Sequence, residues 1–203
     1  SHLFNVAEPS RPIWRDRLGI DVLFVVDYSQ FEAFLLLTGN DENAAAHYAN
    51  TYVATIFEQI RRIYADFHES VAMELRLVGT FIASRPEDCP LRSPVEDDPY
   101  FNATEYTNVT LSDDIESADS SNSTEMSLSL PSSVALSRLV SWIKVNYDLL
   151  PPHDHAIILT KYDLLTSIAY VKMMCKPGDS SSVVEDVGGM ATAMIAAHEL
   201  AHS

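Results

Sequence analysis

The sequence predicts an α/β fold, in which a mixed sheet carries helices on its faces, and two kinds of segment lead to this prediction. Short apolar runs rich in β-branched residues, such as residues 20–27, are typical of buried strands. Longer stretches with apolar residues at helical spacing, such as residues 41–68, are typical of helices that cover a core. Because the two kinds of segment alternate along the chain, layers of helix and sheet are expected.

The expected elements follow in order along the chain. We expect a strand at residues 20–27, a helix at 41–68, a strand at 71–83, and a short strand at 156–160. A further helix precedes that short strand; Ser132 or Ser133 caps its start, and Pro151 and Pro152 end it. Residues 167–173 read as a mixed strand at the edge of the sheet, and the last helix starts near Asp186, a suitable N-cap.

Length and composition indicate one main domain with a long insertion. The chain has 203 residues, of which 47% are hydrophobic, which is enough for one core. Residues 1–19 are polar and read as a linker or the tail of a pro-segment, so the domain is expected over 20–203. Residues 85–131 lack periodicity and are rich in acidic residues, Ser, Asn and Pro, which indicates an acidic surface insertion.

The net charge of −16 argues against two classes of partner. A chain this acidic is a poor ligand for nucleic acid or for an anionic membrane surface. No apolar run reaches the roughly 18 residues that a membrane-spanning helix needs.

Sequons in the acidic insertion favour secretion into the extracellular space. Asn102, Asn108 and Asn122 each begin an Asn-x-Ser/Thr sequon, so glycosylation is expected there. The chain begins without Met or a signal peptide, and we expect a signal to have been removed or to lie outside this sequence.

The two cysteines, Cys89 and Cys175, are too few for a disulfide framework, and either one bridge or two thiols fits them.

The motif H-E-x-x-H near the end of the last predicted helix carries the functional prediction. It consists of His198, Glu199 and His202, after an apolar stretch of helix-forming residues. Histidines at positions i and i+4 share a helix face and can hold one zinc ion, with the glutamate placed as general base for a water molecule. Only two zinc ligands are visible, so the third is expected downstream of Ser203 or is absent.

Four segments upstream share a pattern with one family of zinc proteases. They are residues 21–27, which open with an acid and end with Asp, and residues 153–160, 168–175 and 182–186. Together with the motif, they resemble the catalytic domain of the reprolysin-type metzincins, which include snake-venom metalloproteinases and the ADAM proteases. The acidic chain with its insertion is most similar to secreted salivary forms from arthropods such as ticks.

This resemblance implies a zinc-dependent metalloendopeptidase that hydrolyses peptide bonds in extracellular proteins. It implies a metzincin-like upper subdomain with the motif on its catalytic helix, while the glycine, third histidine and Met-turn of the longer family motif would lie beyond Ser203. It further implies an edge strand that pairs with substrate through Ala169, Tyr170 and Val171. A partner for Cys175 in the part beyond the motif is implied too, which argues against a bridge to Cys89.

The resemblance also implies a calcium site with Asp21 and Asp154 among its ligands, because calcium prefers oxygen donors. Asp154 as an ordinary acid in a turn after Pro152 is the other interpretation.

Two other functions stay open at the level of the sequence. One is a secreted, non-catalytic binding protein on a truncated or degenerate protease fold. The other is a different zinc-peptidase class, such as the thermolysin-like enzymes, whose third ligand is a downstream Glu.

Overall fold

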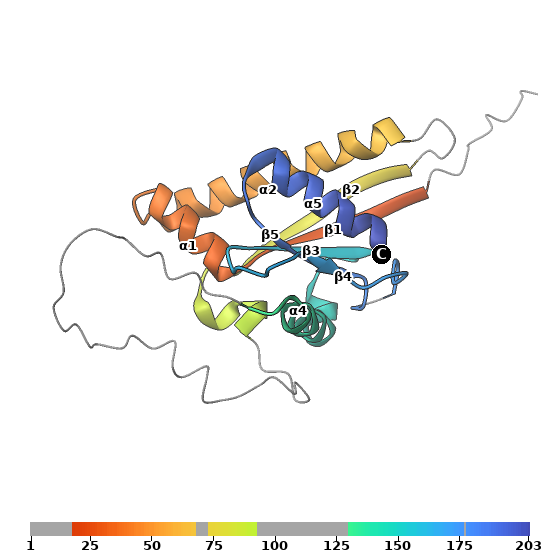
Figure 1. The fold of residues 1–203 in the computed structure, drawn as a ribbon. Helices are drawn as coiled ribbons and strands as arrows, with labels where there is room; N and C mark the ends of the chain where they lie inside the picture. The colour runs from red at the N-terminus through yellow and green to blue at the C-terminus, as the bar shows by residue number, and fades with distance from the viewer. Residues whose placement is uncertain (1–17, 68–72, 93–129, 177) are drawn as a thin grey trace, which may run out of the picture.

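A five-stranded sheet forms the centre of the molecule in the computed structural model, which describes residues 18–67, 73–92, 130–176 and 178–203 (Figure 1). Its strands lie in the order β2-β1-β3-β5-β4. The neighbours β2, β1, β3 and β5 are parallel, and β4 pairs antiparallel with β5. The strands are β1 (Leu18–Val26), β2 (Met73–Ile82), β3 (His155–Thr160), β4 (Ile168–Ala169) and β5 (Ser181–Glu185).

Helices cover both faces of this sheet, so the predicted mixed α/β fold is confirmed. One face carries α1 (Tyr28–Leu37), α2 (Glu42–Phe67) and α5 (Gly189–His202). The other carries α4 (Ser132–Asn146) and the short 3-10 turn Pro90–Arg92. Two further 3-10 turns span Pro86–Asp88 and Tyr147–Leu149. Within the described ranges, no helix has the length and apolar character needed to cross a membrane.

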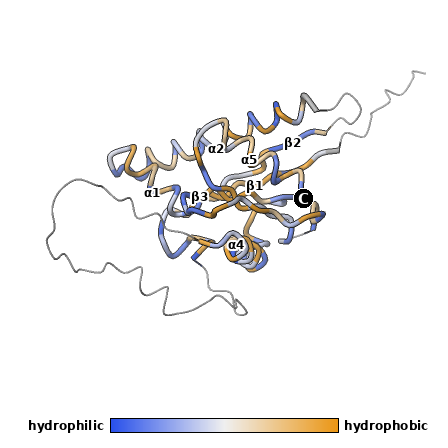
Figure 2. Tube along the Cα trace, viewed as in Figure 1, coloured by the Kyte–Doolittle hydropathy of each residue, from blue (hydrophilic) through white to orange (hydrophobic). Residues whose placement is uncertain are grey.

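The central strands supply side chains to two separate cores, which explains their continuous apolar runs. Along β1, Val22 and Phe24 face the core beneath α1, α2 and α5, whereas Leu23 and Val25 face the core beneath α4. A strand covered on both faces has no polar side to present, so its sequence does not alternate. Figure 2 shows the resulting concentration of hydrophobic residues along the sheet.

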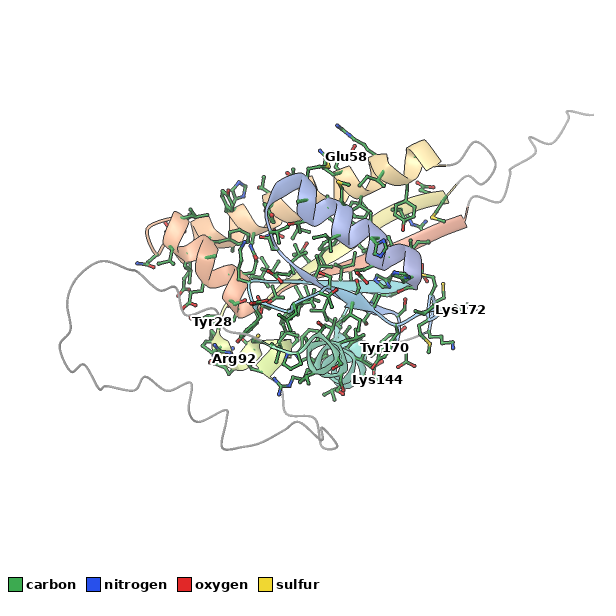
Figure 3. The ribbon with its side chains drawn as sticks, in the orientation of Figure 1. Tyr28, Glu58, Arg92, Lys144, Tyr170 and Lys172 are labelled. Carbon is green, nitrogen blue, oxygen red and sulfur yellow. The ribbon has the colours of Figure 1, made fainter. Side chains whose placement is uncertain are left out.

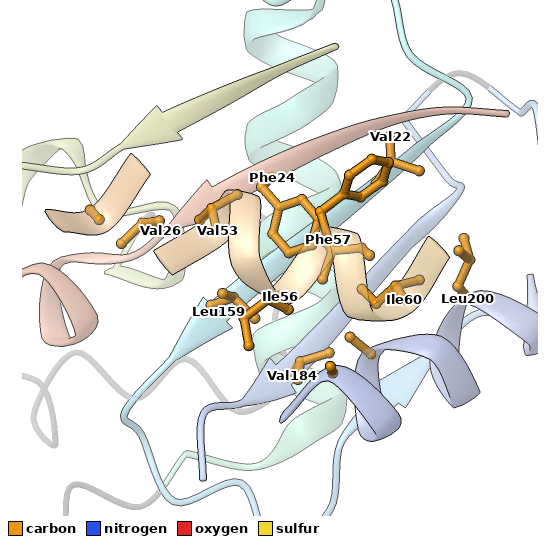
Figure 4. Packing of buried hydrophobic residues seen from close by; sticks show 14 of the residues in the cluster. Val22, Phe24, Val26, Val53, Ile56, Phe57, Ile60, Leu159, Val184 and Leu200 are labelled. Atoms are coloured by element: carbon orange, nitrogen blue, oxygen red, sulfur yellow. The ribbon is translucent and has the colours of Figure 1, made fainter. Parts of the chain in front are cut away.

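The larger core joins β1 to α2 and α5. Phe24 of β1 meets Phe57 of α2 edge to face, with ring centroids 6.3 Å apart. Figure 4 shows this packing, and the residues it labels are Val22, Phe24, Val26, Val53, Ile56, Phe57, Ile60, Leu159, Val184 and Leu200.

Several element boundaries differ from those expected. The sequence did not predict helix α1 or strand β5, because α1 directly follows a strand and β5 begins with two serines, both of which are buried. The expected edge strand at 167–173 is only β4, since the chain turns away after Ala169.

The expected N-caps are also wrong. Helix α5 begins at Gly189, after Gly188 as N-cap, and Asp186 hydrogen-bonds to this region from outside the helix. Ser132 does not cap α4, because its hydroxyl donates to the carbonyl oxygens of Leu164 and Thr166 at 2.6 and 2.7 Å.

The first residues of the insertion predicted at residues 85–131 are packed in the core of the domain. Cys89 and Leu91 are buried beneath α4, so residues 86–92 belong to the packed domain.

The sequon residues Asn102, Asn108 and Asn122 lie outside the described residues, as do residues 1–17 of the expected linker. Strand β1 starts at Leu18, two residues before the expected strand.

Candidate metal centre

The last turn of α5 brings the two motif histidines together. The Nε2 atoms of His198 and His202 are 2.9 Å apart, and the rings stand perpendicular with centroids separated by 4.5 Å. Both side chains are exposed, as expected for positions i and i+4 on the outer face of a helix. The two ring nitrogens are therefore neighbours within hydrogen-bond distance of each other.

This geometry fits one edge of a zinc site. In a tetrahedral site with zinc–nitrogen bonds of about 2.0–2.1 Å, two imidazole nitrogens lie roughly 3.3 Å apart, close to the observed separation. Among the described residues, no cluster of three or more His, Cys, Asp or Glu side chains could hold a metal ion. The two histidines thus match part of the donor set, and the described chain supplies no third ligand beside them.

Glu199 lies between the two histidines in sequence but turns inward. Glu199 is 7% exposed. Burial raises the pKa of its carboxyl above the usual value, and the charges of His198 and His202 reduce this shift. A carboxylate with a raised pKa is a better proton acceptor near neutral pH.

A tyrosine of α2 is hydrogen-bonded to the turn of α5 that carries His198. The hydroxyl of Tyr64 donates to the carbonyl oxygen of Ala197, the residue before His198, at 2.9 Å. Burial raises the pKa of Tyr64 to about 12, so it remains a hydrogen-bond donor. This contact joins the end of α2 to the start of the motif.

The other end of α5 is anchored by Asp186. Its carboxylate accepts hydrogen bonds from the hydroxyls of Thr192 and Tyr52 and forms an ion pair with Lys161 at 3.1 Å. Burial alone would raise the pKa of Asp186, but the donors Thr192 and Tyr52 and the charge of Lys161 lower it overall. No motif marks Tyr52, Tyr64 or Lys161, because each contacts residues far away in the sequence.

The segment expected to bind substrate lies beside the histidine pair. Ala169 ends β4, the last strand at one side of the described sheet, while Tyr170 and Val171 follow it and are exposed. The N–H of Lys172 donates to the carbonyl oxygen of His202 at 2.9 Å, and the Ser203 hydroxyl donates to the carbonyl oxygen of Tyr170 at 3.4 Å. Hydrogen bonds therefore connect the segment after β4 to the end of α5.

The two acids expected to bind calcium are neighbours. Asp154 accepts a hydrogen bond from the N–H of Asp21 at 2.8 Å, and Arg76 forms an ion pair with the Asp21 carboxylate at 2.6 Å. The structure brings Asp21 and Asp154 together, yet it places a guanidinium where a cation would bind. Calcium at this position stays a prediction.

His155, Cys89 and Cys175 do not form part of the histidine pair on α5. His155 is fully buried, and both of its ring nitrogens are engaged, because they lie 2.9 and 3.0 Å from the hydroxyl oxygens of Ser180 and Ser182. Burial lowers the pKa of His155 to about 3. Cys89 is a buried free thiol beneath α4, and Cys175 is an exposed one.

One of three comparisons with known proteins found a match to a family model. Residues 109–203 match the sequence model of the reprolysin (M12B) family of zinc metalloproteases. No curated protein matches the chain. A solved structure described as "Structure of a chaperone-substrate complex" is similar with a TM-score of 0.49 and 13% identity, over 93% of this chain and 24% of that one. This chain thus spans 24% of that protein's length, and so distant a likeness adds nothing to the assignment.

Proposed function

We propose that this protein is a zinc-dependent metalloendopeptidase that hydrolyses peptide bonds in extracellular proteins, because residues 109–203 match the reprolysin family model. One observation supports the proposal most directly. His198 and His202 present their Nε2 atoms 2.9 Å apart on α5, and Glu199 follows the first of them with a raised pKa.

His198 and His202 would hold the zinc ion, together with a third ligand from outside the described residues. Zinc bound there would supply a Lewis acid that makes water nucleophilic near neutral pH and polarises a peptide carbonyl. The hydrogen bond from Tyr64 to Ala197 keeps the turn that carries His198 in position.

Glu199 would act as the general base. Its carboxylate would take a proton from the attacking water and later deliver it to the amine that leaves. Burial favours this role, since it raises the carboxyl pKa toward the pH at which the proton must be exchanged.

The edge of β4 would orient the substrate. An extended peptide can add to an unpaired sheet edge through main-chain hydrogen bonds, which align its backbone whatever its side chains are. Because Lys172 contacts His202, a peptide aligned along Ala169 and Tyr170 would pass beside the histidine pair.

Secretion as a glycoprotein is part of the proposal and rests on the sequons at Asn102, Asn108 and Asn122. Glycosidase treatment of the protein secreted by eukaryotic cells would lower its apparent mass if these sites are used.

The test of the catalytic role is a Glu199→Gln substitution in the full natural protein. We expect proteolysis to fall by about 10²–10⁴-fold, because the base is lost, while zinc content stays the same, because Glu199 is not a ligand. His198→Ala should lose both zinc and activity, and Glu42→Gln on the exposed start of α2 should lose neither. Undiminished proteolysis by Glu199→Gln would rule out the mechanism.

A non-catalytic binding protein on a truncated or degenerate protease fold is the second candidate. Zinc analysis of the natural protein separates the two functions. One tightly bound zinc per chain, lost on His202→Ala, supports the enzyme, whereas a protein that holds no zinc supports the binding role.

A further inference from the structure

A hollow of about 330 Å³ opens between α4 and the chain that follows β4. Its walls include Val140, Ser141 and Lys144 from one face of α4, and Tyr170, Met173 and Asp179 from the segment between β4 and β5. Figure 3 shows Tyr170 close to Lys144 of α4. The hollow lies on the opposite side of the sheet edge from α5, because α4 and α5 cover opposite faces.

An ion pair forms part of the wall of this hollow. Lys144 and Asp179 are 2.5 Å apart, with about half and two fifths of their side chains exposed. Such exposed pairs contribute little to stability. The pair neutralises both charges, so the hollow has no free charge from these two residues.

Gly178 allows this arrangement. Its φ is +75°, and a Cβ atom there would lie 2.6 Å from Cγ of Lys144. The stem of Lys144 therefore packs directly on the backbone of Gly178 and becomes an apolar wall. A side chain at position 178 would clash with this stem.

The hollow is continuous with the edge strand. Strand β4 contacts both α4 and α5, and Tyr170 follows its last residue directly. Lys172, two residues further along, is hydrogen-bonded to the backbone of His202. The same short segment therefore contacts the backbone of His202 on one side and forms part of the hollow on the other.

From this geometry we propose that the hollow receives an aromatic side chain of the peptide substrate. The inference rests on the proposed function, because it needs an extended peptide along β4. Successive side chains of an extended peptide point to opposite faces of the sheet. When one side chain points toward α5 and the histidines, its neighbour points toward α4 and the hollow.

The chemistry of the lining favours an aromatic group over a charged one. Tyr170 offers a half-exposed ring, Met173 a thioether and Val140 an apolar surface, all of which contact aromatic rings favourably. The ammonium of Lys144 can lie against a ring face without leaving Asp179. The volume is at the lower end of the roughly 300–1,000 Å³ typical of ligand pockets, which suits one large side chain.

The test measures peptide binding and cleavage separately. Fluorescent peptides carrying a single Phe, moved along an otherwise Ala- and Ser-rich sequence, are titrated against the zinc-loaded Glu199→Gln protein, which binds without cutting. We expect Phe at one position to lower Kd about tenfold relative to Ala, comparable to the discrimination that apolar pockets achieve. Ser141→Trp, which fills the hollow, should abolish this gain. Ser133→Trp on the exposed side of α4 should preserve it.

Met173→Ala provides a second variant with less risk to folding, and it should reduce the gain from Phe without affecting binding of the Ala peptide. Retention of the full Phe preference in Ser141→Trp and Met173→Ala would overturn the proposal. A preference for Glu or Lys at the position, in place of Phe, would overturn it as well.

Cleavage by the protein with Glu199 intact distinguishes the two proposals. If peptides are cut but these variants leave the preference unchanged, the enzyme function stands and the hollow has another role. If no peptide is cut while the binding pattern appears as expected, the hollow binds peptides and the catalytic function fails.

Discussion

Asp27 is a fully buried carboxylate at the junction of β1 and α1. It caps α1 by accepting the N–H of Gln30 at 2.8 Å, and it accepts the hydroxyl of Thr160 in β3 at 2.8 Å. Burial raises its pKa to about 6, although the hydrogen bonds from Gln30, Thr160 and Ser29 oppose the shift. The sequence placed Asp27 at the end of a strand and predicted no helix after it, and the burial of Asp27 depends on β3, more than a hundred residues away.

The raised pKa of Asp27 predicts a pH-dependent stability. Between the usual pKa of 3.8 and the folded value of about 6, the folded state binds more protons than the unfolded state. The resulting stabilisation is complete below pH 3.8 and is lost as pH rises through 6. Relative to Asp27→Asn, the wild type should therefore gain free energy of unfolding from pH 7.5 to pH 4.5, by at most about 1.4 kcal/mol per pH unit.

Urea titrations of both proteins at the two pH values measure this difference. A constant difference between them would show that Asp27 does not titrate in this window.

Helix α5 divides into a packed face and an exposed face. Ala193, Ala196, Ala197 and Leu200 are buried in the larger core, whereas Met190, Met194 and His198 are exposed. The small residues allow α5 and α2 to pack closely. The apolar run before the motif predicted this helix, but its many alanines gave no indication of which face is buried.

This division predicts different effects for the same substitution on the two faces. Ala196→Leu should lower the free energy of unfolding by about 1–3 kcal/mol, because the larger side chain overpacks the core. Ala191→Leu, on the exposed face, should change it by less than about 0.5 kcal/mol, since Ala and Leu both favour helices. Thermal or urea unfolding measures both, and equal effects would contradict the packing of α5 on α2.

At the scale of the whole molecule, the sheet is most protected at its centre. Strand β3 pairs with β1 and β5, and all six of its residues are buried. Strand β4 has two residues and pairs only with β5 among the described strands. The sheet therefore combines a stable centre with a short edge next to the candidate site.

Hydrogen exchange should reveal this gradient. We expect the amides of β3 to exchange only through global unfolding and those of β4 to exchange at least about tenfold faster, through local opening. Mass spectrometry of peptides from both strands gives the rates. Equal protection of β4 and β3 would indicate that another part of the protein covers the edge.

The sequence by itself determined the α/β fold class and the placement of two histidines on one face of the last helix. Continuous apolar runs identified β1 and β3, and the spacing of His198 and His202 predicted two converging nitrogen donors, because both signals depend only on local periodicity. Tertiary structure decided which distant residues meet: Tyr64 with Ala197, Asp186 with Tyr52, and Lys172 with His202. It also buried Ser180, which precedes β5, and Ser182 of β5 beside His155. Such contacts depend on the order of the strands and the packing of the helices on them, and no local pattern encodes that arrangement.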